Sequence, residues 1–468
     1  MSEKRKVPDP ESGGKQRKIC KRDKVILESL TFAPKHYIRA HSKTKKVDDK
    51  TQVWDVVFEP DPDDASKTTS NVATCGGNSI SVIDVNSGTV CMKYEHQDKQ
   101  EVFYTLAWTT LLFENRRSNI LLSGSISGEI RMFHPEKQVC FRHFRVMELR
   151  NIPVNSILFH SEKPTWLFCG TEDGMITLWD IGPTTLLQYD VSPTSLLKLF
   201  PGFGAVYNIA WTGKNGWLLA GCAAGLVGYQ IEDKKVETME DYAPCRVAFF
   251  QPKSKKDDGQ NPIVDSLVVA SEWTIVSKCA LHGLIYVWDL KATVNSLNKF
   301  NMQAKDDVKR NIINMIESVI EEILDKVVEP KAANNLLDKV NEVEDNDNVE
   351  DNITATNVVM LANLKWSNTD NLFMNLGCHK GKGLIACGDD RGTIWVYNLP
   401  QFGKDGGKPI KGKVEPMTKL EWPDLQDDRQ NNNSPKGQII MDKVVVSHDN
   451  THIVGVTSNN LVCIWRQM

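Results

Sequence analysis

The chain has 468 residues, of which 41% are hydrophobic and 25% are charged, and 12 of them are tryptophan. This composition is typical of a folded protein with a sizeable core, and it excludes a chain that is disordered throughout. The formal net charge of -4 excludes a chain that is basic overall, so any nucleic-acid binding would have to come from a local patch.

The 11 cysteines include no Cys-x-x-Cys pair, which favours a reducing compartment where thiols serve as small apolar core residues. Cys378, His379 and Cys387 lie close in sequence, but two cysteines and one histidine make a weak zinc signal. No window of about 18 apolar residues predicts a membrane span, and the charged N-terminus is unlike a signal peptide. We expect a soluble, intracellular protein without a metal, a cofactor or membrane association.

Residues 1–24 are rich in lysine and arginine and contain almost no apolar side chains, so we expect a disordered basic arm. Two basic clusters about ten residues apart suit a bipartite nuclear import signal. The same side chains could instead contact DNA phosphates or simply be solvated. The candidate import residues are Lys4, Arg5, Lys6, Arg17, Lys18, Lys21 and Arg22.

One pattern recurs along the rest of the chain: an apolar strand, a tight polar turn, and a second apolar strand that ends in an aromatic residue. The clearest copy is 167–180 (LFCGTEDGMITLWD); the others are 73–84, 123–133, 220–230, 277–289, 387–398 and 456–465. Repetition at roughly 40 to 50 residues is typical of a WD-repeat propeller with one four-stranded blade per repeat, whereas a β-sandwich does not repeat one turn chemistry. We therefore predict an all-β fold, a seven-bladed WD40 β-propeller.

We expect the propeller to occupy residues 25–468. Its blades would lie at 51–96, 102–145, 151–190, 205–238, 263–298, 358–400 and 440–468. The last blade lacks a fourth strand after 463–466, whereas a spare strand at 25–38 precedes the first blade. If that N-terminal strand completes the last blade, the ring is closed and no sheet edge remains open.

Two segments do not fit the spacing of the repeats. Residues 239–262 contain an extra strand at 247–250, and residues 301–356 form an insertion between two complete blades. Apolar residues from Val308 to Val327 recur at steps of three and four, which predicts a helix, and an acidic stretch for which we expect disorder follows at 338–351. The helix could pack on the propeller's flank or dock into a groove of a partner.

The innermost strands can be aligned on their repeated apolar positions, and one position per blade then points into the mouth of the central channel. These residues are Trp54, Tyr104, Asn155, Tyr207, Asp265, Phe373 and Asp442. Blade order is also ring order, so Phe373, Trp54 and Tyr104 would gather around the carboxylate of Asp442. Such a site attracts a cation and keeps it partly dry, which suits a methylated lysine, although aromatic mouths also serve ordinary peptide binding or packing.

Several strings resemble the propeller of the leucine-rich repeat and WD repeat-containing protein family, which is associated with the origin recognition complex. They are 72–77 (VATCGG), 102–109 (VFYTLAWT), 178–182 (LWDIG), 386–389 (ACGD), 420–423 (LEWP) and 463–466 (CIWR). The resemblance extends over 50–468 apart from the insertion, and it implies docking to subunits of that complex. The leucine-rich half of the family has no counterpart in this chain, so partners bound through that half do not follow from the resemblance.

The string 103–108 and the hairpin 277–288 are similar, more distantly, to the Polycomb propeller of the embryonic ectoderm development/extra sex combs family. That family reads trimethyl-lysine with an aromatic cage. Its cage positions fall here on Trp54, Tyr104, Leu372 and Phe373. Because Leu372 replaces an aromatic residue, the affinity or the preferred methylation state is expected to differ.

Together with these resemblances, the sequence predicts a nuclear chromatin adaptor that binds methylated histone tails and links heterochromatin to replication, contacting chromatin indirectly. The alternatives are a Polycomb-like scaffold or reader subunit of a histone methyltransferase complex, and a cytoplasmic scaffold with no histone role. The candidate cage is Trp54, Tyr104, Phe373 and Asp442; the rest of the mouth is Asn155, Tyr207, Asp265 and Leu372. No catalytic constellation stands out, so we expect neither enzymatic activity nor a small-molecule substrate.

Overall fold

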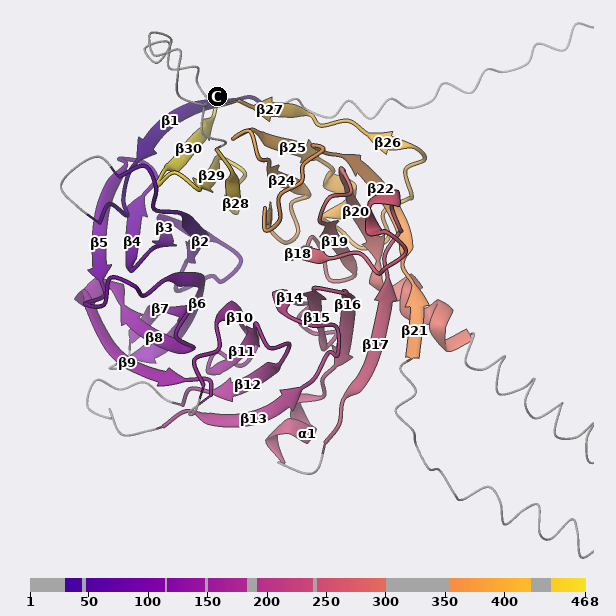
Figure 1. Cartoon of the computed structure of the whole chain (residues 1–468), viewed down its shortest axis with the longest axis horizontal. Coiled ribbons are helices and arrows are strands. Elements are labelled where there is room, and N and C mark those ends of the chain that lie inside the picture. The colour runs from indigo at the N-terminus through magenta and orange to yellow at the C-terminus, as the bar shows by residue number, and fades with distance from the viewer. Residues whose placement is uncertain are drawn as a thin grey trace, which may run out of the picture.

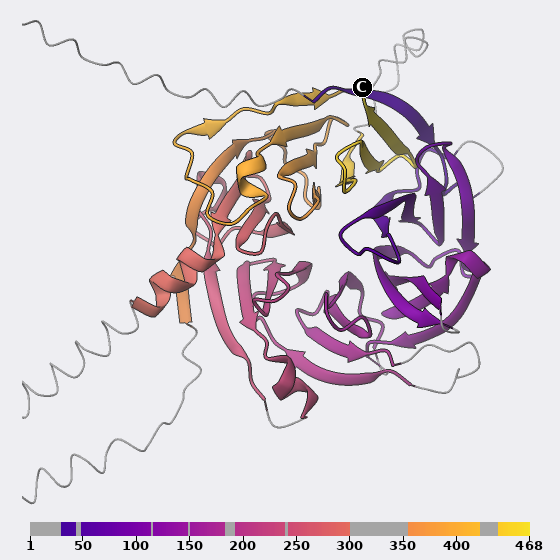
Figure 2. The same cartoon turned by 180° about the vertical axis from the view of Figure 1, so that it is seen from behind.

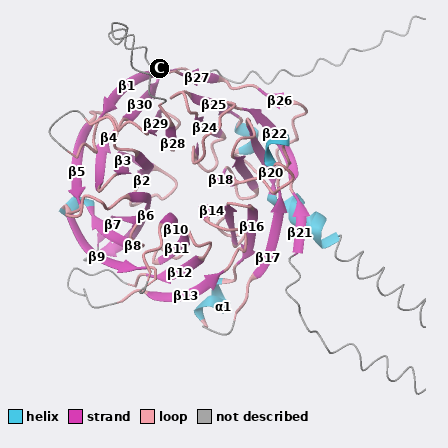
Figure 3. Ribbon diagram, in the orientation of Figure 1, coloured by secondary structure: helices cyan, strands magenta, loops and turns pink. Residues whose placement is uncertain are grey.

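The computed structural model describes residues 30–43, 48–113, 116–147, 150–182, 192–238, 242–299, 354–421 and 439–468. In this part of the chain, seven sheets stand like blades around a central channel (Figure 1). Strands make up the ring, and the helices are short and lie at its periphery (Figure 3). The predicted fold class, an all-β seven-bladed propeller, is confirmed.

The first three blades are simple antiparallel meanders with the first strand innermost. Blade one contains β2 (Val53–Pro60), β3 (Thr68–Gly76), β4 (Ser79–Asp84) and β5 (Thr89–Glu95). Blade two contains β6 (Phe103–Phe113), β7 (Arg116–Ser125), β8 (Glu129–His134) and β9 (Val139–Arg145). Blade three contains β10 (Val154–Phe159), β11 (Trp166–Thr171), β12 (Ile176–Asp180) and β13 (Thr194–Leu199).

The turn between β11 and β12 shows why the repeated hairpin needs glycine. Gly174 has a φ of 84°, in the left-handed region that a side chain disfavours. A Cβ atom at this position would also lie 2.7 Å from the carbonyl oxygen of Gly204 in the next blade. The glycine therefore closes the turn and allows two blades to approach each other.

Blade four differs from our expectation at its outer edge. It contains β14 (Val206–Trp211), β15 (Trp217–Cys222), β16 (Gly225–Gln230) and β17 (Cys245–Phe250). We expected the blade to end at residue 238 and the strand at 247–250 to be an extra one, and both expectations are wrong because β17 pairs with β16 as the fourth strand. Helix α1 (Asp233–Glu237) lies between them in sequence, which obscured the regular spacing.

Blade five contains β18 (Val264–Val269), β19 (Thr274–Cys279), β20 (Leu284–Asp289) and β22 (Val359–Lys365). The insertion does not lie between two complete blades, as we expected, because it connects β20 to β22, whose residues Asp289 and Val359 are paired. Both ends of this connection belong to the fold. Residues 290–299 are helical, and β21 (Thr354–Asn357) pairs in parallel with β17 as a fifth strand of blade four (Figure 1). The expected helix at 308–327 and acidic stretch at 338–351 lie outside the described residues.

Blade six contains β23 (Leu376–Cys378), β24 (Leu384–Gly388), β25 (Ile394–Asn398) and β27 (Thr418–Leu420), while β26 (Lys413–Val414) pairs in parallel with β22. Blade seven contains β28 (Met441–Val446), β29 (His452–Thr457), β30 (Val462–Gln467) and the N-terminal β1 (Phe32–Ile38). The indigo β1 lies beside the yellow C-terminal strands (Figure 2). Short 3₁₀ turns include η1 (Pro135–Lys137), η2 (Lys255–Asp257) and η4 (Pro400–Phe402).

The apolar core lies largely between blades, where the facing sheets bury their side chains. One cluster joins Val53, Val56 and Val72 of blade one to Val454 and Ile464 of blade seven. Such contacts require both neighbours to be present, so the blades stabilise one another only when the ring is complete.

His41, which follows β1, links blade seven to blade one by hydrogen bonds. We call the junction of these two blades the seam. Its imidazole nitrogens lie 2.8 Å from Oγ of Ser79 and 2.9 Å from Oγ1 of Thr74, both in blade one. Its backbone N–H donates to Oδ1 of Asn460 in blade seven, at 3.1 Å. The side chain is buried, and this burial lowers the pKa of His41 to about 3.

Candidate binding site at the channel mouth

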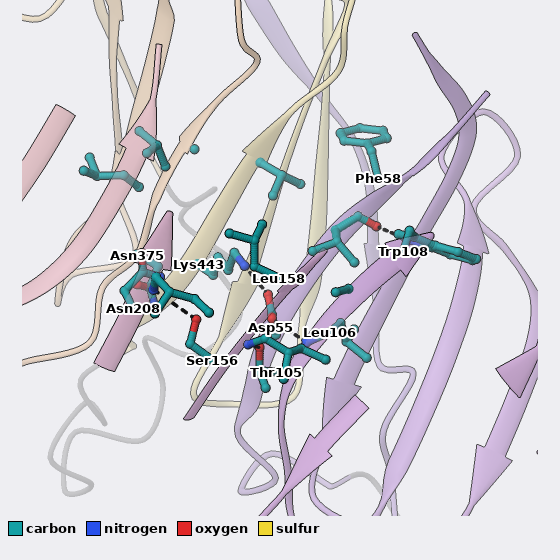
Figure 4. Close-up of a pocket in the computed structure, with 18 of the residues that line it drawn as sticks. Asp55, Phe58, Thr105, Leu106, Trp108, Ser156, Leu158, Asn208, Asn375 and Lys443 are labelled. Atoms are coloured by element: carbon teal, nitrogen blue, oxygen red, sulfur yellow. Dashed lines mark hydrogen bonds and ion pairs between the residues drawn. The ribbon is translucent and has the colours of Figure 1, made fainter. Parts of the chain in front are cut away.

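The central channel contains a cavity of about 500 Å³ between the inner strands. We call the end at which the inner strands begin the mouth. Trp54, Tyr104, Asn155 and Tyr207, each the second residue of its inner strand, line the cavity there. Phe58 and Trp108, further along their strands, line the same cavity on a different part of its wall (Figure 4).

Inside the mouth, polar residues form a belt around the channel (Figure 4). Figure 4 labels six of its members, Asp55, Thr105, Ser156, Asn208, Asn375 and Lys443, and the seventh is Ser266 of blade five. In blades one to five, the belt side chain accepts a hydrogen bond from a backbone N–H of the next blade, over 2.8 to 3.3 Å. In blade six it is the backbone carbonyl of Asn375, not its side chain, that accepts from the N–H of Val444. Lys443 of blade seven closes the circle by an ion pair with Asp55. The belt therefore fixes the register of each blade against its neighbour.

In six of the seven blades, the residue before the belt position occupies a β-bulge. The pairing of the inner strand shifts register between Val53 and Asp55, and the same shift occurs in blades two to five and seven. The bulged residues are Trp54, Tyr104, Asn155, Tyr207, Asp265 and Asp442. A bulge leaves one residue out of the ladder and redirects its side chain, which explains why Trp54, Tyr104, Asn155 and Tyr207 line the cavity.

Trp54 and Tyr104 form the aromatic pair that the alignment predicted. Their rings meet edge to face, with centroids 5.3 Å apart and planes at 87°. Both side chains are half-buried, so part of each ring faces the channel. Burial, followed by the nearby charges of Glu172 and Glu101, raises the pKa of the Tyr104 hydroxyl, which keeps it neutral.

Phe373 lies in the mouth region but not at the aligned position. The N–H of Leu376 bonds to the belt residue Ser266, which makes Met374, fully buried, the counterpart of Trp54. Our alignment was wrong by one residue here because the first strand of blade six starts only at Leu376. Phe373 has a φ of 65°, a left-handed conformation that costs a non-glycine residue about 1 kcal/mol.

The left-handed backbone directs Phe373 toward blade four. Its ring lies 4.9 Å from that of Tyr207, with planes at 75°, and its N–H donates to Asp265 at 2.9 Å. The mouth thus has two aromatic pairs, Trp54 with Tyr104 and Tyr207 with Phe373. Leu372 is half-buried in the loop before β23. Neither Leu372 nor Phe373 lines the cavity itself, and Phe373 reaches the mouth through its contact with Tyr207.

Asp265 is not a residue of the open mouth, contrary to our expectation. Its carboxylate is fully buried and accepts two hydrogen bonds of 2.6 Å from Nζ of Lys278. Lys278 is also fully buried, and its Nζ lies 5.0 Å from the centre of the Trp366 ring. A buried ammonium needs a carboxylate partner, and this need draws Asp265 away from the channel.

Asp442 does not supply the expected negative charge. The residue is only 2% exposed, and its Oδ1 accepts a 2.8 Å hydrogen bond from Gln52. Burial raises the pKa of this carboxyl well above its usual range, which favours the neutral acid. The expected arrangement of Phe373, Trp54 and Tyr104 around Asp442 is therefore wrong.

The structure brings a different carboxylate to the mouth, that of Glu172, which our sequence analysis had treated only as part of a turn. Nδ2 of Asn155 donates to Oε2 of Glu172 at 2.6 Å and to the carbonyl of Val206 at 3.2 Å. Glu172 is exposed, and its charge is close enough to contribute to the raised pKa values of Tyr104 and Tyr207. The sequence did contain a signal for this carboxylate, because Asn155 is polar whereas the equivalent residues of blades one, two and four are aromatic.

This arrangement is suited to an organic cation, because aromatic faces and a nearby carboxylate both attract positive charge. In the described part of the chain, no group of three or more His, Cys, Asp or Glu side chains is placed to hold a metal ion. The helices described there are all too short or too polar to cross a membrane. The candidate import residues from Lys4 to Arg22 lie outside the described residues.

The repeated blades and the closed ring define a WD-repeat propeller with a ligand-sized aromatic mouth. The family model "Leucine-rich repeat and WD repeat-containing protein 1, WD domain" matches residues 26–303 and 349–468, and the chain belongs to this family.

Named relatives agree with this assignment. Leucine-rich repeat and WD repeat-containing protein 1 of Danio rerio is 29% identical over 465 residues, which cover 95% of this chain and 51% of that protein. The Xenopus tropicalis protein of the same name is 27% identical, over 97% of this chain and 58% of its own length. The chain therefore spans about half the length of these relatives.

A solved structure shares the fold at low sequence identity. A chain in the crystal structure of the Chaetomium thermophilum polycomb repressive complex 2 matches with a TM-score of 0.60 and 10% identity, over 93% of this chain and 98% of that one. Both resemblances seen in the sequence are thus confirmed, the first at the level of family and the second at the level of fold.

Proposed function

We propose that this propeller is a nuclear chromatin adaptor whose mouth binds a methylated lysine of a histone tail. The observation that carries the proposal is the pairing of four half-buried rings at one channel end, Trp54 with Tyr104 and Tyr207 with Phe373. Methylation leaves the charge of lysine, removes N–H donors and adds apolar surface. A partly dry aromatic mouth therefore favours the methylated side chain over the strongly hydrated unmodified one.

The remaining parts of the proposal come from the family. We infer that the flanks of the propeller dock subunits of the origin recognition complex, and that the protein works in the nucleus as a non-catalytic scaffold that meets chromatin through its partners. The basic residues of 1–24 would direct nuclear import. Since the chain spans about half of its relatives, partners that bind elsewhere on those proteins are outside the proposal.

The test of the mouth is the binding of methylated histone peptides by calorimetry. Trp54→Ala or Tyr104→Ala should weaken binding by about 1 to 2 kcal/mol for each lost aromatic face. The matched control is Trp108→Ala, which removes a half-buried aromatic residue from another part of the channel wall, where its indole donates to the carbonyl of Val57. Equal losses in all three variants, or none in the first two, would refute the aromatic mouth as the binding site.

The alternative partner is a histone methyltransferase complex, which the shared fold with a chain of polycomb repressive complex 2 favours. Affinity purification of the full chain from nuclear extract, followed by mass spectrometry, separates the two. Recovery of origin recognition subunits supports docking to that complex, and recovery of methyltransferase subunits supports the Polycomb-like scaffold. A reporter fused to residues 1–24 that stays in the cytoplasm would contradict the assigned import signal.

A further inference from the structure

Each blade ends at the rim of the ring in an edge strand (Figure 1). An edge strand presents unpaired N–H and C=O groups that can pair with another chain, and proteins commonly prevent this with a charged side chain or a proline in the strand. In the described part of the chain, six of the seven edge strands are protected in this way. The protecting residues are Lys93 of β5, Arg145 of β9, Lys198 of β13, Lys413 of β26, Lys419 of β27, and Pro34 and Lys35 of β1.

The edge strand of blade four, β21, lacks this protection. Its residues Thr354–Asn357 include neither a charged residue nor a proline, and the sequence has no charge from Asn352 to Leu364. Among the residues that the structure describes, β21 pairs with β17 alone. Beside this edge, Phe250 of β17 is 41% exposed and lies opposite Asn357 in the ladder. Blade four therefore presents an edge that a further strand can extend.

The sequence of β21 suits pairing with a copy of itself. Thr354 and Thr356 flank Ala355 symmetrically, and the side chain of Ala355 is small and exposed. Antiparallel pairing about a two-fold axis at Ala355 would place Thr354 opposite Thr356 of the partner subunit. Threonine pairs directly across a ladder are favourable, whereas like charges in these positions would repel, and β21 has none.

We propose that β21 is a homodimer interface, at which two propellers join edge to edge about a two-fold axis through Ala355. The five-stranded sheets of the two copies of blade four would then form one continuous sheet. Such a dimer uses the same surface of both subunits. A four-residue ladder buries less than the ~1,200 Å² of a stable interface, so we expect a weak dimer with a dissociation constant on the order of 10 µM.

Sedimentation equilibrium of the full chain, from about 1 to 200 µM, measures the association. The wild-type chain should shift from monomer to dimer over this range. Ala355→Lys places two like charges at the axis and should raise the dissociation constant at least about tenfold. The control is Thr89→Lys, which adds the same charge at an exposed position of the edge strand β5 and should leave the dimer intact. Thermal unfolding should give similar midpoints for all three chains, because both positions are exposed.

Disulfide formation tests the position of the axis. Two residues on the axis would have Cα atoms about 4.5 to 5.5 Å apart, which is within the range of a disulfide. Ala355→Cys should therefore form a covalent dimer under mild oxidation. Asn357→Cys is the control, because the position is also exposed but its two copies would lie about 13 Å or more apart. The wild-type chain gives the background from the exposed Cys91 and Cys245.

A dimer that Ala355→Lys dissociates and Thr89→Lys retains, together with faster cross-linking of Ala355→Cys than of Asn357→Cys, supports the proposal. A wild-type chain that is monomeric at every concentration overturns it and leaves the edge to a strand of another protein. A dimer that persists in Ala355→Lys forms at another surface and overturns it as well. Equal cross-linking of the two cysteine variants would contradict the axis at Ala355.

Discussion

His41 makes the closure of the ring sensitive to acid. The folded chain holds this imidazole neutral, with a pKa of about 3, whereas an unfolded chain binds a proton near pH 6.5. Between these values the unfolded state binds the additional proton. Stability therefore rises with pH up to about 6.5 and is lost as the pH falls through that value.

We expect this one histidine to cost about 2 kcal/mol of folding free energy between pH 7 and pH 5. Urea unfolding of wild type and His41→Gln at the two pH values measures the effect, and the variant should show a smaller pH dependence from a lower starting stability. His143→Gln, which replaces an exposed histidine, serves as the control. An unchanged pH dependence in His41→Gln would show that the imidazole is not what acid acts on.

Residue type alone did not decide which side chains face the mouth. Trp54, Tyr104 and Tyr207 line the cavity, as the alignment indicated, because each occupies the bulge of its inner strand. Asp265 occupies an equivalent bulge, but its side chain is buried away from the channel, because the buried Lys278 on the adjacent strand requires a carboxylate partner. Glu172 was missed because its position depends on a contact with Asn155 across the sheet.

The outermost strands were the hardest elements to predict. β17 and β22 follow α1 and the insertion, so they carry neither the turn chemistry nor the spacing by which the inner hairpins are found. Their pairing depends on edges that β16 and β20 present only in the folded blade. Long connections hide such strands because loop length is a weak constraint on which edges can meet.

The connection between β20 and β22 therefore contains a dispensable and an indispensable part. Replacing residues 300–353 with a Gly/Ser linker should leave a cooperatively folded propeller, since Asp289 and Val359 still pair. Replacing 290–357 should cost about 3 kcal/mol or more, because Leu290 and Leu297 leave the core and Val359 loses its bond to Thr293. Thermal unfolding compares the two deletions, and equal midpoints would contradict this division.

At the scale of the whole ring, Asp55 of the belt connects three blades, its own blade one and the neighbouring blades two and seven. Its carboxylate accepts from the N–H of Leu106 in blade two at 2.8 Å and pairs with Lys443 of blade seven. Asp55→Ala leaves an ammonium without its partner in a largely buried site, so we expect a loss of about 3 to 5 kcal/mol. Ser156→Ala, which removes a single neutral link of the belt, should cost about 1 kcal/mol.

The ion pair can be separated from the rest of the belt by a double-mutant cycle. Adding Lys443→Met to Asp55→Ala removes the uncompensated charge and should restore part of the lost stability in urea unfolding. Strictly additive losses in the double variant would mean that Asp55 acts through its backbone bonds alone.

The circular architecture as a whole was accessible from sequence because it is specified repeatedly. Hairpins with one turn chemistry recur, and the chain offers one strand before the first blade for a last blade that lacks one. The pairing of β1 with β30 joins these two ends of the pattern. The extra parallel strands β21 and β26 have no such repeated signal, and the sequence gives no indication of them.

The same closure determines how the ring would respond to mechanical tension. Phe32 at the start of β1 lies opposite Gln467 at the end of β30, so the chain enters and leaves the seam at one point. If Phe32 and Gln467 were pulled apart, the force would act on one hydrogen-bonded pair of the ladder at a time, because the hydrogen bonds run perpendicular to the strands. Strand β1 would therefore separate from β30 pair by pair. Once β1 has been peeled off, the seam at His41 is the next to be loaded. Blades one to three are each built from one continuous run of the chain, and the parallel strands β21 and β26 link blades four, five and six to one another. These six blades stay out of the line of force until the ring has opened.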